Sequence, residues 1–467
     1  MKVTLLFPNI NIGRIIKIPF HPPLGLAMLA AVVEKLGYDV SVIDATALNL
    51  NDKELIRKLK EINPDVIGIT TNILLVRRSL EASRLIQRQI PNVKLVFGGP
   101  WASAVYEMLL RKRYCDFVIV GEGEYSFAEL LSALEKGELP KTKPGIAYLD
   151  SNTIQLEPPQ PIENLDSLPF PAWHLFPSPK KYLHYRRKLI FYPIMTSRGC
   201  PYQCNHCTKI VHGTRVRFRS IENVIDEIRY LKERFSIEEL TIIDDNFTVN
   251  KKRAEKIIDE IIKLNYNLLI QFSNGLRADT LTLKLVKKLK RAGTYKIAIG
   301  VESGNQDVVN KIGKKLDLNA VRRAAQIIKR EKIILVAFFI IGHPFDTVKT
   351  MKDTINFALE IDPDTPLFFK AIAFPGTELY NQVQRDGKFL IALKDIDHGY
   401  NLSSANYEIY NLRAADVEKM FKMAYRRFYL RPRKMTSLLT KIRSISELKA
   451  AIDYSILIIL NLLNLKQ

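Results

Sequence analysis

The 467-residue sequence has little of several features that mark special classes of protein. Its four cysteines are too few for a disulfide scaffold in a chain of this length, which predicts a reducing compartment. No apolar run reaches the ~18 residues of a membrane-spanning helix. With 21 Gly and 23 Pro, the composition is neither low-complexity nor collagen-like. The apolar run that ends at Pro8 does not resemble a signal peptide, so we expect a cytoplasmic globular protein.

Positive charge is in excess, with 70 Lys and Arg against 49 Asp and Glu and a net charge of +21. Such an excess fits a lysine-rich solvated surface, contact with an anionic membrane, or nucleic acid. The basic residues spread along helical faces, as in 284–293, and do not gather with aromatic residues. This pattern favours a solvated surface. Peripheral contact with a membrane is the second interpretation, and binding to nucleic acid is disfavoured.

Short β-branched runs alternate with helical patterns over the first 140 residues. The predicted strands lie at 2–8, 40–44, 65–70, 94–99 and 116–123. Strands separated by about 10–15 residues of helical period are typical of βαβ units and a parallel sheet. We therefore expect a Rossmann-like, doubly wound α/β domain over residues 1–140, with its ligand beyond the carboxyl ends of the strands.

The composition changes at residues 141–190, where prolines concentrate and periodicity is lost. This predicts a Pro-rich linker, within which we expect Trp173 and Phe176 to dock on a neighbouring part of the protein. Over 191–376 the alternation returns, and the pattern predicts a partial (β/α)6 barrel of the TIM type with its site at the strand carboxyl ends. The predicted barrel strands lie at 190–198, 239–245, 268–274, 296–303, 335–342 and 367–374.

Residues 377–467 are expected to form a C-terminal helical domain, with a helix at 414–430 and an apolar tail at 454–465. The tail is too short to cross a bilayer. It fits either a packed C-terminal helix or a helix that lies at a membrane interface.

Three cysteines, Cys200, Cys204 and Cys207, lie close together directly after a predicted strand. A structural zinc site would need a fourth ligand, for which His206 and His212 are candidates. A four-iron cluster held by the three thiolates would leave one iron open. The tight loop favours the cluster, and an open iron can bind a small chelating molecule and pass it an electron. The fourth cysteine, Cys115, fits a small buried hydrophobic residue.

C-x3-C-x2-C after the first strand of a (β/α)6 barrel resembles the radical S-adenosylmethionine (SAM) superfamily. Similarity to the cobalamin-binding branch of this family extends over roughly residues 1–430. The segments that carry it occur in the right order, and they are 21–44, 96–103, 118–131, 168–177, 196–207, 218–228, 243–250, 300–306, 338–344 and 374–380.

The resemblance implies that Cys200, Cys204 and Cys207 hold a [4Fe-4S] cluster. Reductive cleavage of SAM at that cluster would give methionine and a 5′-deoxyadenosyl radical that removes hydrogen from an unactivated carbon. The residues implied to contact SAM are Asp244, Asp245 and Asn246 at its ammonium group, Asn274 and Arg277 at its carboxylate or ribose, Glu302 at its ribose, and Ile341 and Gly342 at its adenine. Those implied to hold cobalamin are Leu24, Gly25, Thr70, Thr71, Asn72, Gly98, Gly99, Gly121, Glu122 and Gly123.

The sequence also departs from the family pattern. It has no D-x-H-x-x-G motif, which implies that the lower face of cobalamin is left to loop residues or water. Trp101 follows Gly-Gly-Pro where relatives often have His, and His206 stands before the third cysteine where relatives often have an aromatic residue.

The resemblance predicts a cobalamin-dependent radical SAM enzyme that functionalises an unactivated carbon of a small-molecule or lipid substrate, with C-methylation as the commonest outcome. The alternative is non-methylating ring formation on a membrane lipid, such as tetraether cyclisation. An external donor such as ferredoxin or flavodoxin would supply the electron. A tRNA methylthiotransferase is disfavoured because the N-terminal domain has only Cys115. A non-catalytic cobalamin or SAM sensor with a structural zinc is the reading from another class.

Overall fold

The computed structural model describes residues 1–10, 21–182, 189–390, 404–432 and 434. The chain divides into two compact units. The first takes the described part of residues 1–183 together with Thr208–Gly213, and the second takes the described parts of residues 184–207, 214–392 and 401–467. Each unit has its own principal sheet.

The first unit is built on a seven-stranded sheet with the order β2-β1-β3-β4-β5-β6-β7. Its strands are β1 (Lys2–Phe7), β2 (Asp39–Asp44), β3 (Val66–Thr70), β4 (Lys94–Gly98), β5 (Phe117–Ile119), β6 (Ile146–Asp150) and β7 (Thr153–Leu156). Strands β1 to β5 pair in parallel, and β6 and β7 continue the sheet antiparallel. The parallel part, in which β1 lies between β2 and β3, confirms the doubly wound prediction.

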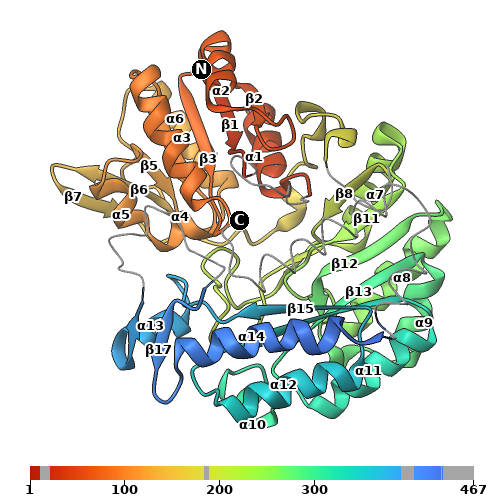
Figure 1. Ribbon diagram of the computed structural model, residues 1–467. Coiled ribbons are helices and arrows are strands. Elements are labelled where there is room, and N and C mark those ends of the chain that lie inside the picture. Colours follow the sequence, from red (N-terminus) through yellow and green to blue (C-terminus); the bar gives the residue numbers. More distant parts are fainter. Residues whose placement is uncertain (11–20, 183–188, 391–403, 433, 435–467) are drawn as a thin grey trace. The chain divides into compact units, whose positions relative to one another are not determined.

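Helices join the parallel strands of this sheet (Figure 1). They are α1 (Leu24–Lys35), α2 (Asp52–Ile62), α3 (Val76–Gln89), α4 (Pro100–Ala104), α5 (Tyr106–Arg111) and α6 (Glu124–Glu135). Helix α2 shows why such helices form locally. Asn51 and Glu54 make a reciprocal capping box at its start, and Asn63 ends it in the left-handed conformation. Apolar residues of α2 and α3, such as Leu59 and Leu80, pack with Ile67 and Phe97 in one buried core.

Part of the segment 141–190, expected to be linker, belongs to this sheet. The backbone groups of β6 find partners along β5, and those of β7 along β6, which the proline content of the segment did not indicate. Trp173 is buried and meets Phe176 edge to face, and the Ala172 amide donates to Ala27 of α1. The expected docking of Trp173 is therefore confirmed. Short 3-10 turns follow at η1 (Leu165–Ser167), η2 (Trp173–Leu175) and η3 (Pro179–Lys181).

The second unit has a six-stranded, all-parallel sheet with the strands in chain order from β8 to β15. They are β8 (Phe191–Ile194), β11 (Glu239–Ile242), β12 (Leu269–Leu276), β13 (Thr294–Glu302), β14 (Ile334–Ile341) and β15 (Thr365–Lys370). The connecting helices are α7 (Ile221–Phe235), α8 (Lys251–Leu264), η4 (Ala278–Thr280), α9 (Leu283–Arg291), α10 (Gln306–Lys311), α11 (Leu318–Arg330) and α12 (Val348–Ile361). Six parallel strands in sequential order confirm the partial (β/α)6 barrel.

The last described elements are α13 (Glu378–Asp386), β16 (Gly387–Phe389), β17 (Tyr407–Ile409) and α14 (Ala414–Tyr429). Helix α14 lies beside α12 (Figure 1), and its Glu418 pairs with the buried Lys370 ammonium of β15. The predicted apolar tail, 454–465, lies outside the described residues. Within the described part of the chain, no helix is long and apolar enough to span a membrane.

Candidate functional site

The three clustered cysteines lie on the loop that follows β8 and β9 (Ser197–Arg198), the latter paired with β10 (Arg217–Phe218). None of the three is in a disulfide; Cys200 and Cys204 are half-buried and Cys207 is exposed. The Cys207 amide donates to the Cys204 carbonyl (3.1 Å), which closes a turn between the second and third cysteines. Among the described residues, no three Cys, His, Asp or Glu side chains already form a metal-binding group. The loop therefore brings three cysteines, candidate thiolate ligands, together on one short segment.

Two carboxylates after β11 hold the start of this loop. The buried Asp244 accepts hydrogen bonds from the Thr196 amide (2.7 Å) and from the hydroxyls of Thr196 and Ser197 (2.6 Å each). Burial raises the pKa of Asp244, and these hydrogen bonds oppose the rise. Asp245 accepts from the Gly199 amide (2.8 Å). Both carboxylate oxygens of Asp244 thus accept hydrogen bonds from within the chain, so Asp244 serves to hold the start of the loop. This geometry does not support the contact with the SAM ammonium group that the sequence predicts for Asp244.

Asn246 differs from its two neighbours. Its side chain is buried, and neither the amide nitrogen nor the amide oxygen has a hydrogen-bond partner in the described structure. A buried amide without partners costs free energy, about 1–3 kcal/mol for each unsatisfied group. A bound ligand would remove this cost, so Asn246 fits the predicted SAM contact better than Asp244.

Arg277, at the end of β12, is engaged within the protein. Its guanidinium donates to the carbonyls of Lys314 and Lys315 (2.9 Å each), pairs with Asp279, and lies 3.5 Å from the ring centroid of Tyr202 in the cysteine loop. The geometry therefore favours a role in bracing the loop over the predicted contact with SAM. The exposed Asn274 donates to the Ile243 carbonyl (2.6 Å).

A turn after α10, residues 312–315, supports the cysteine loop from a second side. The Asn205 amide donates to the Ile312 carbonyl (2.9 Å), and a Cβ at Gly313 would overlap the Gln203 carbonyl oxygen. On the far side of the loop, the Leu379 amide donates to the Asn205 carbonyl (2.8 Å). Sequence reasoning missed this turn because nothing local links residues 312–315 to residues more than a hundred positions earlier.

Glu302, at the end of β13, is buried and forms an ion pair with Lys314 (2.6 Å). Burial raises its pKa, but the charges of Lys314 and His206 outweigh that effect and hold the pKa of Glu302 below its usual value. Its backbone has a φ of +67°, a left-handed conformation that is rare for Glu and marks local strain. The structure therefore places Glu302 at the predicted barrel rim with one oxygen bound to Lys314, a partner that sequence reasoning did not identify.

The two residues that the resemblance places beside adenine, Ile341 and Gly342, lie at the carboxyl end of β14. Ile341 is buried, and Gly342 adopts a φ of +91°, where an added Cβ would meet Val417 at 2.8 Å. The next residue, His343, is fully buried, and its ring centroid lies 5.4 Å from that of His206. The sequence shows a Gly-His-Pro at this strand end but gives no sign of the pairing with His206.

In the first unit, the carboxyl ends of β3 and β4 bring together Thr70, Thr71, Gly98 and Gly99. The Thr71 amide donates to the Gly98 carbonyl (2.8 Å). Gly99 has a φ of +99°, and a Cβ added there would lie only 2.6 Å from the Thr71 carbonyl oxygen. The Thr71 hydroxyl is buried without a partner in the described structure. The indole N–H of the buried Trp101 is likewise without one.

The remaining residues predicted for cobalamin have local roles. Asn72 accepts from the Leu74 amide (2.9 Å), and the buried Glu122 accepts from the Ile162 amide (2.6 Å). Gly121, with a φ of +84°, donates to the Ser103 hydroxyl (3.0 Å), and Gly123 precedes α6. Leu24 begins α1, and a Cβ at Gly25 would meet no atom within 4 Å. Glu122 therefore serves to hold the segment around Ile162, while Gly25 borders open space.

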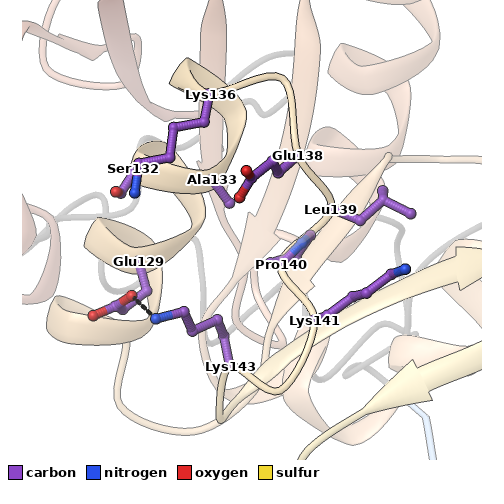
Figure 2. Close-up of a pocket in the computed structure, with 9 residues that line it drawn as sticks. All are labelled: Glu129, Ser132, Ala133, Lys136, Glu138, Leu139, Pro140, Lys141 and Lys143. Carbon is purple, nitrogen blue, oxygen red and sulfur yellow. Dashed lines mark ion pairs between the residues drawn. The ribbon is translucent and has the colours of Figure 1, made fainter.

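Figure 2 shows a surface pocket beside the end of α6, where Glu129 pairs with Lys143 (2.6 Å). Its lining is Glu129, Ser132, Ala133, Lys136, Glu138, Leu139, Pro140, Lys141 and Lys143. None of these residues belongs to the predicted strand-end sites, and we do not assign the site there.

Comparison with known proteins decides the family. Residues 19–131 match the family model of the B12 binding domain, and residues 194–358 match that of the radical SAM superfamily. An uncharacterized methyltransferase of Pyrococcus horikoshii is 32% identical over 440 residues, which cover 93% of each chain. The chain belongs to the cobalamin-binding branch of the radical SAM superfamily.

Other relatives of this radical SAM protein differ in their reactions. The anaerobic magnesium-protoporphyrin IX monomethyl ester cyclase of Rubrivivax gelatinosus is 25% identical, covering 82% of this chain and 70% of the relative. Cytidylyl-2-hydroxyethylphosphonate methyltransferase of Streptomyces wedmorensis is 27% identical, covering 83% and 82%. The protein is thus an enzyme of a family that includes methyltransferases and cyclases.

Solved structures support the fold. The radical SAM methyltransferase TsrM from Kitasatospora setae, solved with cobalamin and a [4Fe-4S] cluster bound, aligns with a TM-score of 0.68 at 20% identity, over 82% of this chain and 78% of TsrM. The cobalamin-dependent radical enzyme OxsB aligns with a TM-score of 0.72 at 18% identity, over 97% and 70%. The cofactors that belong to the two domains are cobalamin, SAM and a [4Fe-4S] cluster.

The residues of each unit fit these groups. Three cysteines on one loop, none of them in a disulfide, are the donor set that a cluster with one open iron needs. The partnerless amide of Asn246 can meet a polar ligand, and the partnerless Thr71 hydroxyl beside two glycines suits close approach of a large cofactor.

Proposed function

We propose that this radical SAM protein methylates an unactivated carbon. The observation that carries the proposal is the trio of cysteines, Cys200, Cys204 and Cys207, none of them in a disulfide, on one braced loop after the first barrel strand, in a chain that also carries a B12 binding domain. Methylation is supported by the relatives from P. horikoshii and S. wedmorensis, both named methyltransferases.

When bound, the cluster, SAM and cobalamin supply the electron transfer, the 5′-deoxyadenosyl radical and the methyl carrier for this chemistry. The protein's part is to position them. Cys200, Cys204 and Cys207 hold the cluster, while Asp244 and Asp245 fix the strand that leads into their loop. The Asn246 amide oxygen accepts from the SAM ammonium group, a charge-assisted hydrogen bond.

The loop is braced on its other side by Arg277 and by the turn 312–315. This bracing keeps the spacing of the three thiols fixed before the cluster binds, which lowers the cost of ordering the loop. In the first unit, Thr71 and Gly99 would form the backbone edge against cobalamin, with Gly98 beside them. Trp101 would offer an indole N–H to this cofactor and no metal-ligating nitrogen.

Ring formation without methylation is the second candidate, because the relative from R. gelatinosus is named a cyclase. A membrane lipid is a substrate proposed for this alternative, on the basis of the basic composition and the apolar segment 454–465. Transfer of deuterium from a labelled lipid into 5′-deoxyadenosine would support it, and inertness toward lipids would remove it. In either reaction, SAM cleavage consumes an electron, for which we propose ferredoxin or flavodoxin as donor.

Product analysis separates the candidates. The anaerobically reconstituted protein, loaded with cobalamin, is incubated with SAM and a low-potential reductant. Formation of both 5′-deoxyadenosine and S-adenosylhomocysteine is the expected result and supports methylation. Deoxyadenosine without the homocysteine product would favour cyclisation. If neither product forms in a preparation that contains iron and sulfide, the proposed function is wrong.

A further inference from the structure

Four ionisable side chains lie together at the carboxyl ends of the barrel strands. Glu302 and Lys314 form a buried ion pair, and His206 and His343 both lie close enough to Glu302 to affect the pKa of its carboxyl group. His206 directly precedes Cys207, and its ring lies 5.4 Å from that of His343. The cluster therefore adjoins the cysteine loop.

His343 has no hydrogen bond from its ring. Its side chain is 0% exposed, and neither Nδ1 nor Nε2 has a partner in the described structure. Burial, followed by the charge of His206, lowers the pKa of His343 to about 3, so the ring is a neutral imidazole with one N–H donor and one acceptor nitrogen. Each group left unsatisfied costs about 1–3 kcal/mol, and a native protein keeps such a group when it has a use.

The backbone around His343 is held by several hydrogen bonds. Asp346 accepts from the amides of Gly342 (3.0 Å) and His343 (2.9 Å), and the Tyr407 hydroxyl donates to the Gly342 carbonyl (2.6 Å). Thr350 in turn donates to Asp346 (2.6 Å). The backbone that carries the ring is thus held at the strand end, and within the described structure both ring nitrogens are without a partner.

We propose that His343 is a binding residue for the nucleoside part of SAM. This inference rests on the proposed function. SAM has an amino acid end that needs charged or metal partners, a sulfonium that makes no hydrogen bonds, and a ribose and adenine that carry neutral donors and acceptors. A neutral imidazole, with one donor and one acceptor nitrogen, complements the neutral groups of the nucleoside without a charged partner. Its neutrality also avoids repulsion of the positive sulfonium, and the ion pair of Glu302 with Lys314 leaves the surroundings close to neutral.

The test measures SAM binding and stability on the same cluster-containing, unreacted protein. His343→Phe keeps a ring and removes both polar atoms, whereas His343→Gln keeps a donor and an acceptor. We expect the Phe variant to bind SAM about tenfold more weakly, as for the loss of one hydrogen bond, and the Gln variant to recover most of that loss. Without SAM, the Phe variant should melt at a higher temperature than the wild type, since two unsatisfied groups are gone.

Methionine serves as the second ligand, because it has the amino acid end and no nucleoside. Its affinity should be the same in wild type and His343→Phe. The half-exposed His174, which pairs with Glu34 in the first unit, provides the control variant His174→Phe, expected to bind SAM normally.

Wild-type SAM affinity in His343→Phe would overturn the inference, and so would an equal loss of SAM and methionine binding. If the melting temperature and the SAM affinity both fall in the Phe variant and in the Gln variant, the role of His343 is purely structural. That result would also contradict the inference. If the wild-type protein, loaded with iron and sulfide, binds no SAM, the proposed function fails instead.

Discussion

At the scale of single residues, Asp44 at the end of β2 titrates in an unusual range. Its buried carboxylate accepts from the Ala47 amide (2.8 Å) and the Tyr182 hydroxyl (3.0 Å). Burial nevertheless raises its pKa from 3.8 to about 6. The unfolded chain therefore binds fewer protons than the folded one between about pH 4 and pH 6, and the free energy of unfolding falls as pH rises through this window.

Replacing Asp44 by Asn should remove this dependence. At pH 7 the variant is expected to be more stable than the wild type by up to about 3 kcal/mol, the equivalent of a shift of about two pKa units. At pH 4 the two should nearly coincide. Chemical unfolding of the first unit at both pH values measures this, with Asp39→Asn on the exposed start of β2 as the control. A constant difference between pH 4 and pH 7 would contradict the assignment.

Individual side chains also show how far the sequence could be read. Position at a strand end was predictable for Asp244, Asp245, Asn246, Arg277 and Glu302, because periodicity locates where a parallel strand stops. The direction in which each side chain points was not. Asp244 accepts hydrogen bonds from the start of the cysteine loop, whereas Arg277 donates to Lys314 and Lys315 and stacks on Tyr202 of that loop. Lys314 pairs with Glu302. These contacts depend on tertiary packing, for which a single sequence carries no local signal.

At the scale of elements, the turn 312–315 is the test of whether the cysteine loop needs its brace. Gly313 has a φ of +76°, and the carbonyl of Gln203 occupies the place where a Cβ would lie. Gly313→Ala should displace the loop, so that iron retained after reconstitution falls several-fold while the first unit melts as before.

Gly137→Ala is the matched control for this variant, since Gly137 has a φ of +71° and open space around its Cβ position. It carries the same backbone penalty of about 1–2 kcal/mol without the clash. Iron retention should be normal in this control. Equal iron content in the two variants would show that the turn does not position the loop.

The elements themselves were largely predictable. The βα alternation in both units follows from local strand and helix periods, and both principal sheets appear where it placed them. Strands β6 and β7 were missed because they lie in a proline-rich segment, and the pairing of β6 with β5 is a long-range contact. The expected tail helix at 454–465 lies outside the described residues.

At the scale of the whole molecule, the chain has two compact units, one that matches the B12-binding family and one that matches the radical SAM family. Loss of a cluster thiol should therefore affect the second unit and leave the first folded. The basic composition does not decide the reaction; the family and the three cysteines on one loop indicate radical SAM chemistry, and product analysis separates methylation from ring formation.

The most direct measurement is the metal and sulfide content of the anaerobically purified and reconstituted chain, compared with its Cys204→Ala variant. The account predicts about four irons and four sulfides per wild-type chain, and a large loss of both in the variant, whose first unit should still unfold cooperatively. One zinc per chain without inorganic sulfide, or a variant that keeps the full iron content, would contradict the central claim that these thiolates hold an iron–sulfur cluster.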